Sequence, residues 1–280
     1  MFDLKRKKAF VCDLDGTLFM GAKPIAPAVK FVIDGTKSGR FSFFYLTNNT
    51  SRCPEEYLRK ISGAEIPVSE DQILTPLLTL ESYIRERKLK SVFLLASRKV
   101  QEHLEKRLAG TDVEFGYDPE ANELIALTYD KELTYDKLAK AASLWNMRNC
   151  PPSPMCPVRT ANKSPVDYVA THPDMCCPSE QGPIPDIGGM MKFLELTNGM
   201  KPSHVFGKPS PTLLAPVLER FRPEEVAVVG DRLYTDKAIA DNAGVDFVCV
   251  LSGETSLADL EAYSGTPPAI VVETFDRVAD

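Results

Sequence analysis

Two aspartates, Asp13 and Asp15, are the residues of this chain best placed to do chemistry. They close the apolar, β-favouring run 9–12 at a spacing of i, i+2, and Gly16 and Thr17 come next. A strand that ends in this way delivers its carboxylates to the carboxyl edge of a sheet, where open α/β folds place their ligands. Two carboxylates held close together repel each other unless a cation lies between them, and Mg²⁺ is a hard cation that prefers oxygen ligands. The spacing therefore predicts a metal-assisted site with one aspartate free to attack, and its alternative is an ordinary Asp-Gly turn.

Polar side chains also follow two other apolar runs. The run 41–46 leads into Thr47 and Asn48, whose hydroxyl, amide and backbone N–H groups can hold phosphate oxygens. Lys208 closes the short strand expected at 205–209, and its ammonium can neutralise an attacking carboxylate and a phosphoryl oxygen together. Taken alone, these features also fit an Asn-rich turn and a solvated lysine.

A further acidic pair follows the buried run 226–230. Asp231 comes directly after this run, and Asp236 lies at the start of the next expected helix. Asp236 also fits an acidic residue favoured by the helix dipole. Asp231, at the end of a buried strand, has no such simple explanation, and we expect it at the same sheet edge as Asp13.

The elements that must position these residues alternate between strand and helix. Such alternation with short connections predicts an α/β fold with a doubly wound parallel sheet. The expected strands cover 8–13, 41–46, 226–231, 246–251 and 269–272, and the expected helices cover 27–38, 54–62, 212–221, 236–243 and 257–263. A second, smaller α/β unit is expected from strands at 92–96 and 123–128 with helices at 99–108 and 135–145.

We expect one sheet domain made from both ends of the chain, 1–77 and 188–280, and an inserted domain over 78–187. The proline-rich stretch 149–186 interrupts the alternation, as functional or mobile segments do.

Composition excludes several classes of protein. A net charge of −6 argues against a general nucleic-acid surface, and no apolar run is long enough to cross a bilayer. Seven cysteines, an odd number, indicate a reducing cytoplasm rather than a disulfide framework.

Taken together, the four strand ends resemble the four motifs of the haloacid dehalogenase (HAD) superfamily. The matching segments are Asp13-Leu14-Asp15-Gly16-Thr17, Thr47-Asn48-Asn49, Lys208, and Gly230-Asp231 with Asp236. The resemblance implies a Rossmann-like HAD core. The stretch 48–207 is long enough for an α/β cap of type C2, and the segment 170–174 is similar to the NagD-like and 4-nitrophenylphosphatase group.

The resemblance also implies a reaction, the hydrolysis of a small phosphate monoester. Asp13 would be the nucleophile that forms an aspartyl-phosphate, and Asp15 would protonate the leaving alcohol and later deprotonate water. Thr47, Asn48 and Lys208 would hold the phosphoryl oxygens.

A magnesium ion is implied as cofactor. Its ligands would be Asp13, the backbone carbonyl of Asp15, and Asp231, with Asp236 assisting directly or through water.

The cap is where the sequence departs from the group, because His172 stands where asparagine is usual before Pro-Asp. His172 and Asp174 are candidates for contact with the leaving group, and a Pro-Asp turn is the alternative. A zinc site using His172 and the cysteines at 150, 156, 176 and 177 is conceivable, although the spacings are not typical. The group also suggests a homodimer formed through the cap.

Two other functions stay open. A dehalogenase uses an aspartate nucleophile without metal, and Asp15 with the acids Asp231 and Asp236 argues against it. A HAD-fold binding or regulatory protein would not need every catalytic position to be filled, as it is here. The physiological substrate is not readable from these residues.

Overall fold

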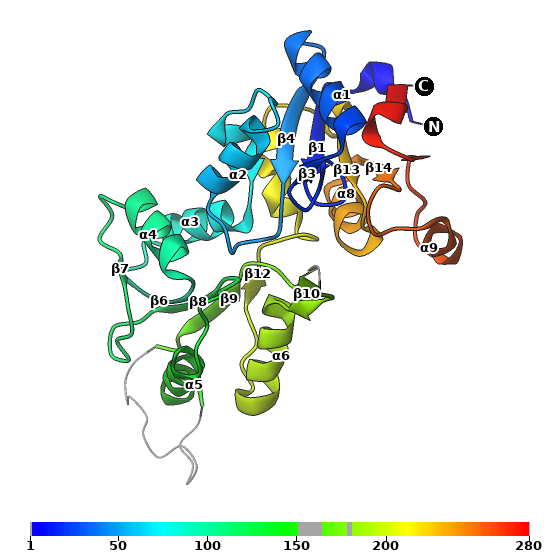
Figure 1. Cartoon of the computed structure of the whole chain (residues 1–280). Helices are drawn as coiled ribbons and strands as arrows, with labels where there is room; N and C mark the ends of the chain where they lie inside the picture. Colours follow the sequence, from blue (N-terminus) through cyan, green and yellow to red (C-terminus); the bar gives the residue numbers. More distant parts are fainter. Residues whose placement is uncertain (1, 151–163, 178–180, 280) are drawn as a thin grey trace. The chain divides into compact units, whose positions relative to one another are not determined.

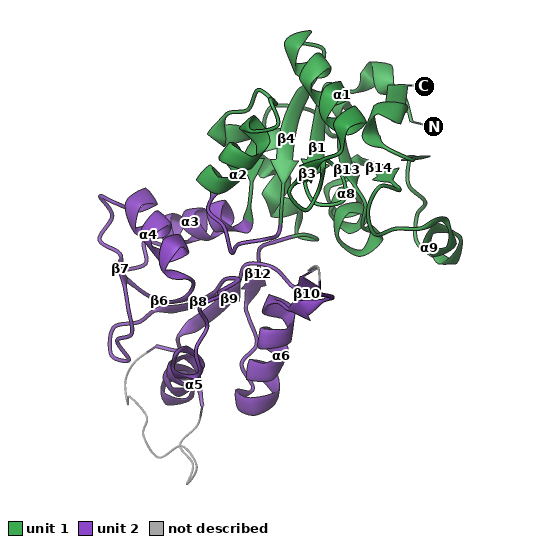
Figure 2. Ribbon diagram, in the orientation of Figure 1, with its two compact units in different colours: residues 1–47, 54–75, 208–280 green, residues 48–53, 76–207 purple. Residues whose placement is uncertain are grey.

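The computed structural model describes residues 2–150, 164–177 and 181–279, which form two compact units (Figures 1 and 2). The first unit comprises Met1–Thr47, Pro54–Thr75 and Lys208–Asp280, and the second comprises Asn48–Cys53 and Pro76–Gly207.

The first unit contains a six-stranded parallel sheet. Its strands are β1 (Ala9–Asp13), β4 (Ser42–Leu46), β5 (Ile73–Leu74), β13 (Val226–Gly230), β14 (Asp246–Val250) and β15 (Ile270–Val272), in the spatial order β15-β14-β13-β1-β4-β5. Its helices are α1 (Ala26–Lys37), α2 (Pro54–Ser62), α7 (Ala215–Leu218), α8 (Ala238–Ala243) and α9 (Leu257–Ala262). A small hairpin, β2 (Phe19–Met20) with β3 (Lys23–Pro24), follows β1, and a π-helical turn, η5 (Leu233–Lys237), precedes α8. Short 3₁₀ turns are η1 (Leu4–Arg6), η2 (Glu70–Gln72), η3 (Pro211–Leu214), η4 (Pro223–Glu225) and η6 (Phe275–Ala279).

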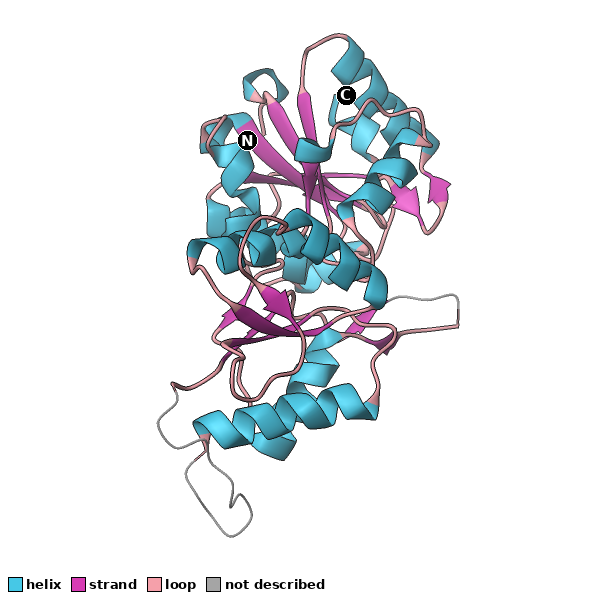
Figure 3. Cartoon of the chain, turned by 90° about the vertical axis from the view of Figure 1, so that its left-hand side faces the viewer, coloured by secondary structure: helices cyan, strands magenta, loops and turns pink. Residues whose placement is uncertain are grey.

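Both faces of this sheet are covered by helices, as Figure 3 shows. Successive side chains of a strand point to opposite faces. Phe10 and Cys12 of β1 pack in the core that includes α1 and α2, whereas Ala9 and Val11 pack in the core that includes α7 and α8. Burial on both faces explains why the strands are continuous apolar runs in the sequence. Because β1 and β13 pair in parallel, their carboxyl ends lie next to each other.

The second unit contains a five-stranded parallel sheet. Its strands are β6 (Ser91–Leu95), β7 (Glu114–Phe115), β8 (Leu124–Leu127), β9 (Asp167–Ala170) and β12 (His204–Val205), in the order β12-β9-β8-β6-β7. Helices α3 (Pro76–Glu86) and α4 (Arg98–Arg107) pack in one core, and α5 (Tyr135–Asn149) and α6 (Ile187–Asn198) pack in the other. A two-stranded hairpin, β10 (Cys176–Cys177) with β11 (Ile184–Pro185), precedes α6.

The α/β class and the parallel sheets expected from the sequence are confirmed. Two local expectations are wrong. The helix expected at 212–221 consists of the turn η3 followed by the short α7, and the strand β9 lies inside the proline-rich stretch 149–186, where no strand was expected.

Residues 188–207, expected in the first domain, lie in the second unit. The physical reason is packing: α6 contributes to a core of that unit, and β12 pairs in parallel with β9.

Among the described residues, the helices all lack the combination of length and apolar character that a bilayer span requires.

Candidate active site

Three carboxylates and one ammonium meet at the carboxyl edge of the first unit's sheet. Asp13 ends β1, Asp231 follows β13, and Asp236 lies on η5. One carboxylate oxygen from each of these three side chains lies within 4.8 Å of the other two. The ammonium of Lys208 lies 2.5 Å from Asp13 Oδ1 and 2.6 Å from Asp236 Oδ1. All four side chains are buried, so the structure brings together four of the residues that the sequence predicted for one site.

The turn after β13 fixes the Asp236 carboxylate. The backbone N–H of Arg232 donates a hydrogen bond to Asp236 Oδ2 at 3.1 Å, while Oδ1 accepts from Lys208. A Cβ at Gly230 would lie only 2.4 Å from this carboxylate, so only glycine fits there. Both oxygens of Asp236 are therefore engaged by the protein.

Asp231 is held differently, because only one of its two carboxylate oxygens accepts a hydrogen bond from the described residues. The backbone N–H of Glu254 donates to Oδ2 at 2.7 Å, whereas Oδ1 is buried and has no hydrogen-bond partner among the described residues. Two glycines make room for the carboxylate: a Cβ at Gly16 would lie 2.3 Å from Oδ2, and one at Gly253 would lie 2.0 Å from it. Gly16 also has a φ of +93°, which L side chains rarely adopt. A buried, unpaired carboxylate oxygen costs free energy unless something outside the protein binds it.

Burial and like charge shift the acids of this cluster. Burial raises the pKa of Asp13 well above its usual value, against the lowering effect of Lys208, and the carboxylates of Asp236 and Asp231 raise it further. Burial, with a contribution from Asp236, raises the pKa of Asp231 to about 6. Burial by itself lowers the pKa of Lys208, but Asp13 and Asp236 outweigh it and raise that pKa above its ordinary value. Lys208 lies against Asp13 and Asp236, and the guanidinium of Arg232 acts on Asp13 and Asp231, so two cations face three acids that disfavour one another's charged forms.

Asp15 is placed outside this buried cluster. Its side chain is 51% exposed, and its Oδ1 accepts a hydrogen bond from the Lys60 ammonium at 2.8 Å. Lys60 was not singled out in the sequence, where it is one of several charged residues on an amphipathic helix.

Thr47 and Asn48, predicted to hold phosphate, fall in different units. The buried Thr47 donates its backbone N–H to the carbonyl of Leu74 at 3.1 Å. Within the second unit, Asn48 Nδ2 lies 3.2 Å from each carboxylate oxygen of Asp174. The structure therefore joins one predicted phosphate-binding residue to one predicted cap residue.

His172 is fully buried in the second unit. Its Nε2–H donates to Asp186 Oδ1 at 3.0 Å, and the same oxygen accepts the backbone N–H of Ile187 at 2.7 Å. Asp186 was not singled out in the sequence. Contact of His172 with a leaving group stays a prediction, and the described contacts indicate that His172 supports the start of α6.

Replacing His172 with asparagine is expected to destabilise the protein by about 1–3 kcal/mol, because a shorter side chain removes the imidazole donor and leaves the buried Asp186 carboxylate with only the Ile187 N–H as a donor among the described residues. Urea unfolding measures this loss. His204→Asn is the matched control, since His204 is exposed, and it should change the unfolding free energy by less than about 0.5 kcal/mol. Equal stability of the two variants would contradict this role.

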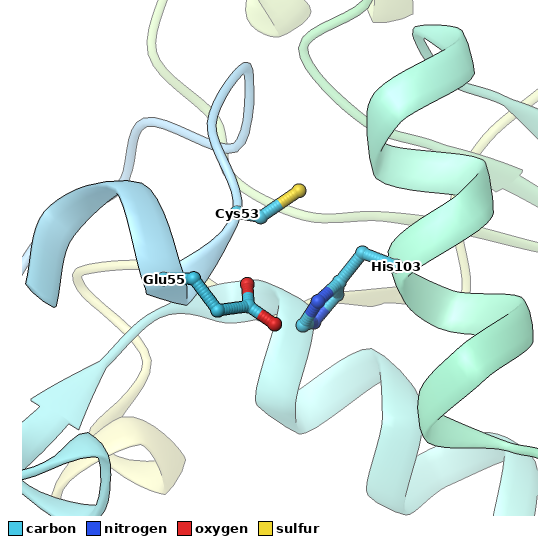
Figure 4. A group of neighbouring side chains, drawn as sticks. All are labelled: Cys53, Glu55 and His103. Atoms are coloured by element: carbon cyan, nitrogen blue, oxygen red, sulfur yellow. The ribbon is translucent and has the colours of Figure 1, made fainter. Parts of the chain in front are cut away.

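Among the described residues, the side-chain clusters that could hold a metal ion do not include the zinc site expected from the cysteines. The described residues whose ligand atoms lie close to those of His172 are Asp174 and Asp186, not cysteines. Cys156 lies outside the described residues. Two further buried residues of the second unit, Cys53 and His103, are labelled in Figure 4. Cys53 packs in an apolar core of that unit and donates to the carbonyl of Lys99, so it belongs to the packing.

Two family models match the chain. The model for haloacid dehalogenase-like hydrolases covers residues 10–108, and the model for HAD-hydrolase-like domains covers residues 205–278. These segments contain Asp13, Asp15, Lys208, Asp231 and Asp236.

Solved structures and curated proteins agree with these matches. The chain resembles the crystal structure of 4-nitrophenylphosphatase from Thermotoga maritima, with 32% identity, 99% of this chain and 97% of that chain covered, and a TM-score of 0.83. It also resembles p-nitrophenyl phosphatase from Archaeoglobus fulgidus, with 27% identity, 97% and 98% covered, and a TM-score of 0.81. Acid sugar phosphatase of Staphylococcus aureus is 29% identical, with 99% of both chains covered.

The likeness to the Thermotoga enzyme runs over nearly all of both chains, and the family models contain the buried acids and Lys208. The chain therefore belongs to the haloacid dehalogenase-like hydrolases and, within them, to the phosphatases of the NagD and 4-nitrophenylphosphatase group.

Proposed function

We propose that this chain hydrolyses a small phosphate monoester by nucleophilic attack of Asp13, with Mg²⁺ as cofactor. The observation that carries the proposal is the buried cluster in which Lys208 contacts both Asp13 and Asp236 while Asp231 keeps an oxygen without a partner among the described residues. A structural ion pair needs no third carboxylate of this kind.

Asp13 supplies the nucleophile. Its carboxylate oxygen attacks phosphorus, the bond from phosphorus to the ester oxygen breaks, and an aspartyl-phosphate forms. Asp15 gives its proton to the departing alcohol oxygen. Water then attacks the aspartyl-phosphate, Asp15 takes the proton from that water, and phosphate leaves with Asp13 regenerated.

Lys208 and Thr47 are assigned to the phosphoryl oxygens. Lys208 is held by two buried carboxylates, so its ammonium needs no reorganisation when negative charge develops. Asn48 receives the same role from its motif alone.

The residues at the sheet edge fit a magnesium ion. Asp13, Asp231 and the backbone carbonyl of Asp15 would hold it, and Asp236, whose oxygens bond Lys208 and Arg232, would assist through water. When bound, the ion would neutralise charge on the transferring group. The space that Gly16 and Gly253 leave around the Asp231 carboxylate supports this assignment.

Replacing Asp231 with asparagine is expected to stabilise the metal-free protein at pH 7 by about 1–3 kcal/mol and to remove its response to Mg²⁺. The folded-state pKa of about 6 lies above the unfolded value of 3.8, so the folded state binds this proton more tightly. Asp231 therefore makes the metal-free protein less stable as pH rises from about 4 to about 6.

Thermal unfolding in EDTA and in Mg²⁺, at pH 5 and pH 7, measures both effects. Asp34→Asn is the matched control, because Asp34 is an exposed helix residue. A variant at Asp231 that unfolds earlier than wild type in EDTA, or that is still stabilised by Mg²⁺, would contradict the assignment.

For the substrate class we propose a phosphorylated metabolite such as a sugar phosphate, in keeping with the relatives named acid sugar phosphatase. His172 and Asp174 stay proposed determinants of leaving-group selectivity. A cytoplasmic location and a homodimer formed through the second unit are proposed with them.

Phosphate release from 4-nitrophenyl phosphate and from a panel of sugar phosphates, with Mg²⁺ or with EDTA, tests the function. We expect release in Mg²⁺ only, with Asp13→Asn as the blank. No release above that blank with any ester would refute the proposal.

A further inference from the structure

Lys60 of α2 lies against Asp15, and both belong to the first unit. Its ammonium is 2.8 Å from Asp15 Oδ1 and 4.6 Å from the centroid of the Phe19 ring. The Lys60 side chain is only 14% exposed, although the Asp15 side chain is 51% exposed. The ammonium is therefore enclosed between a carboxylate and an aromatic face of the same turn after β1.

The backbone of that turn is already fixed by hydrogen bonds. The N–H of Gly16 donates to the carbonyl of Phe19 at 2.7 Å, and the N–H of Phe19 donates to the carbonyl of Leu14 at 2.8 Å. The ring of Phe19 is buried in the core beside α2. Rotation of the Asp15 side chain is then the remaining freedom of this residue, and the ion pair with Lys60 restricts it.

This ion pair differs from an ordinary surface pair on a helix. Lys30 and Asp34 of α1 form such a pair, and their side chains are 75% and 60% exposed. Exposed pairs hold their side chains weakly because water and salt compete for both charges. Lys60 is largely shielded from water and lies over an aromatic ring, which favours one position of its ammonium.

We infer that Lys60 is a positioning residue for Asp15, holding one carboxylate oxygen so that the other faces the ester oxygen that must be protonated. Among the described residues, no group donates a hydrogen bond to Asp15 Oδ2, so this oxygen is available to the reacting group. The inference rests on the proposed function, in which Asp15 exchanges a proton with the leaving alcohol and with water. Lys60 does not touch the reacting atoms and acts through Asp15.

A double-mutant cycle tests this role in the full chain. The variants are Lys60→Met, Lys60→Arg, Asp15→Asn and the double variant Lys60→Met/Asp15→Asn. The substrates are glycerol 3-phosphate, whose alkoxide leaving group needs a proton, and 4-nitrophenyl phosphate, whose phenolate needs one far less. Lys30→Met is the matched control, because it removes a lysine from an exposed helical ion pair.

We expect Lys60→Met to lower kcat about 10-fold on glycerol 3-phosphate and about 2-fold on 4-nitrophenyl phosphate, with KM changed less than about 2-fold. Lys60→Arg should recover most of the activity, since it keeps the charge, and Lys30→Met should match wild type. In the Asp15→Asn background, Lys60→Met should have no further effect. A methionine stem still covers Phe19, and thermal unfolding verifies that the variants are folded.

Different results would overturn different statements. If wild type releases no phosphate from these two esters or from the panel of sugar phosphates, the proposed function fails, and the inference fails with it. If wild type is active but Lys60→Met keeps or exceeds wild-type kcat, or lowers kcat equally with and without Asp15, only the inference fails.

Discussion

Replacing Asp13 with asparagine is expected to lower phosphate release by at least about 10⁴-fold without lowering the free energy of unfolding. An amide cannot attack phosphorus, so no aspartyl-phosphate forms. Stability should not fall because the pKa of Asp13 is raised. Burial and the carboxylates of Asp236 and Asp231 disfavour the charged form of the Asp13 side chain. The neutral amide removes one of three crowded negative charges, and Lys208 keeps its bond to Asp236.

Steady-state rates in Mg²⁺ and urea unfolding in EDTA check the two parts of this prediction. Asp34→Asn, the same change on an exposed helix, should leave both quantities near wild type. Residual activity within about 10-fold of wild type would show that another group is the nucleophile.

Replacing Lys208 with methionine is expected to lower both the free energy of unfolding and kcat. The change leaves the buried carboxylates of Asp13 and Asp236 without their shared ammonium, which costs about 3–5 kcal/mol of stability. It also removes a preorganised positive charge from the transferring group, which lowers kcat about 10²–10³-fold.

Lys7→Met separates the two effects. Lys7 is also buried and pairs with Asp246, and its ammonium donates to the carbonyls of Glu224 and Val226. We expect this control to lose stability and to keep its activity per folded molecule. Urea unfolding and kcat, measured below the unfolding transition, distinguish the variants. A Lys208→Met protein as stable and active as wild type would refute the role of Lys208.

The buried cluster could be predicted from the sequence because its members follow strands of one parallel sheet. Asp13 and Asp231 come directly after apolar runs, and parallel strands bring their carboxyl ends to one edge. The spacing of motifs then assigned Lys208 and Asp236 to the same edge.

The remaining contacts depend on tertiary packing that local sequence does not encode. His172 reads as part of a Pro-Asp turn, and only the placement of Asp186 shows that it is a buried hydrogen-bond donor. Lys60 has the pattern of a solvated helix lysine, and its enclosure requires the ring of Phe19 to be in place. Residues 188–207 fall in the second unit for a similar reason, since the pairing of β12 with β9 is not local.

The place of β1 between β4 and β13 has a consequence for how the chain acquires its structure. β1 pairs with β13, so Val11 must find Val228 after more than two hundred intervening residues have been synthesised. Loop closure of that length is slow, whereas the pairings of β6 and β8 join nearer segments. The second unit should therefore mature first on the ribosome, while β1, which can already pair with β4, waits for β13 and its unpaired edge depends on protection from aggregation.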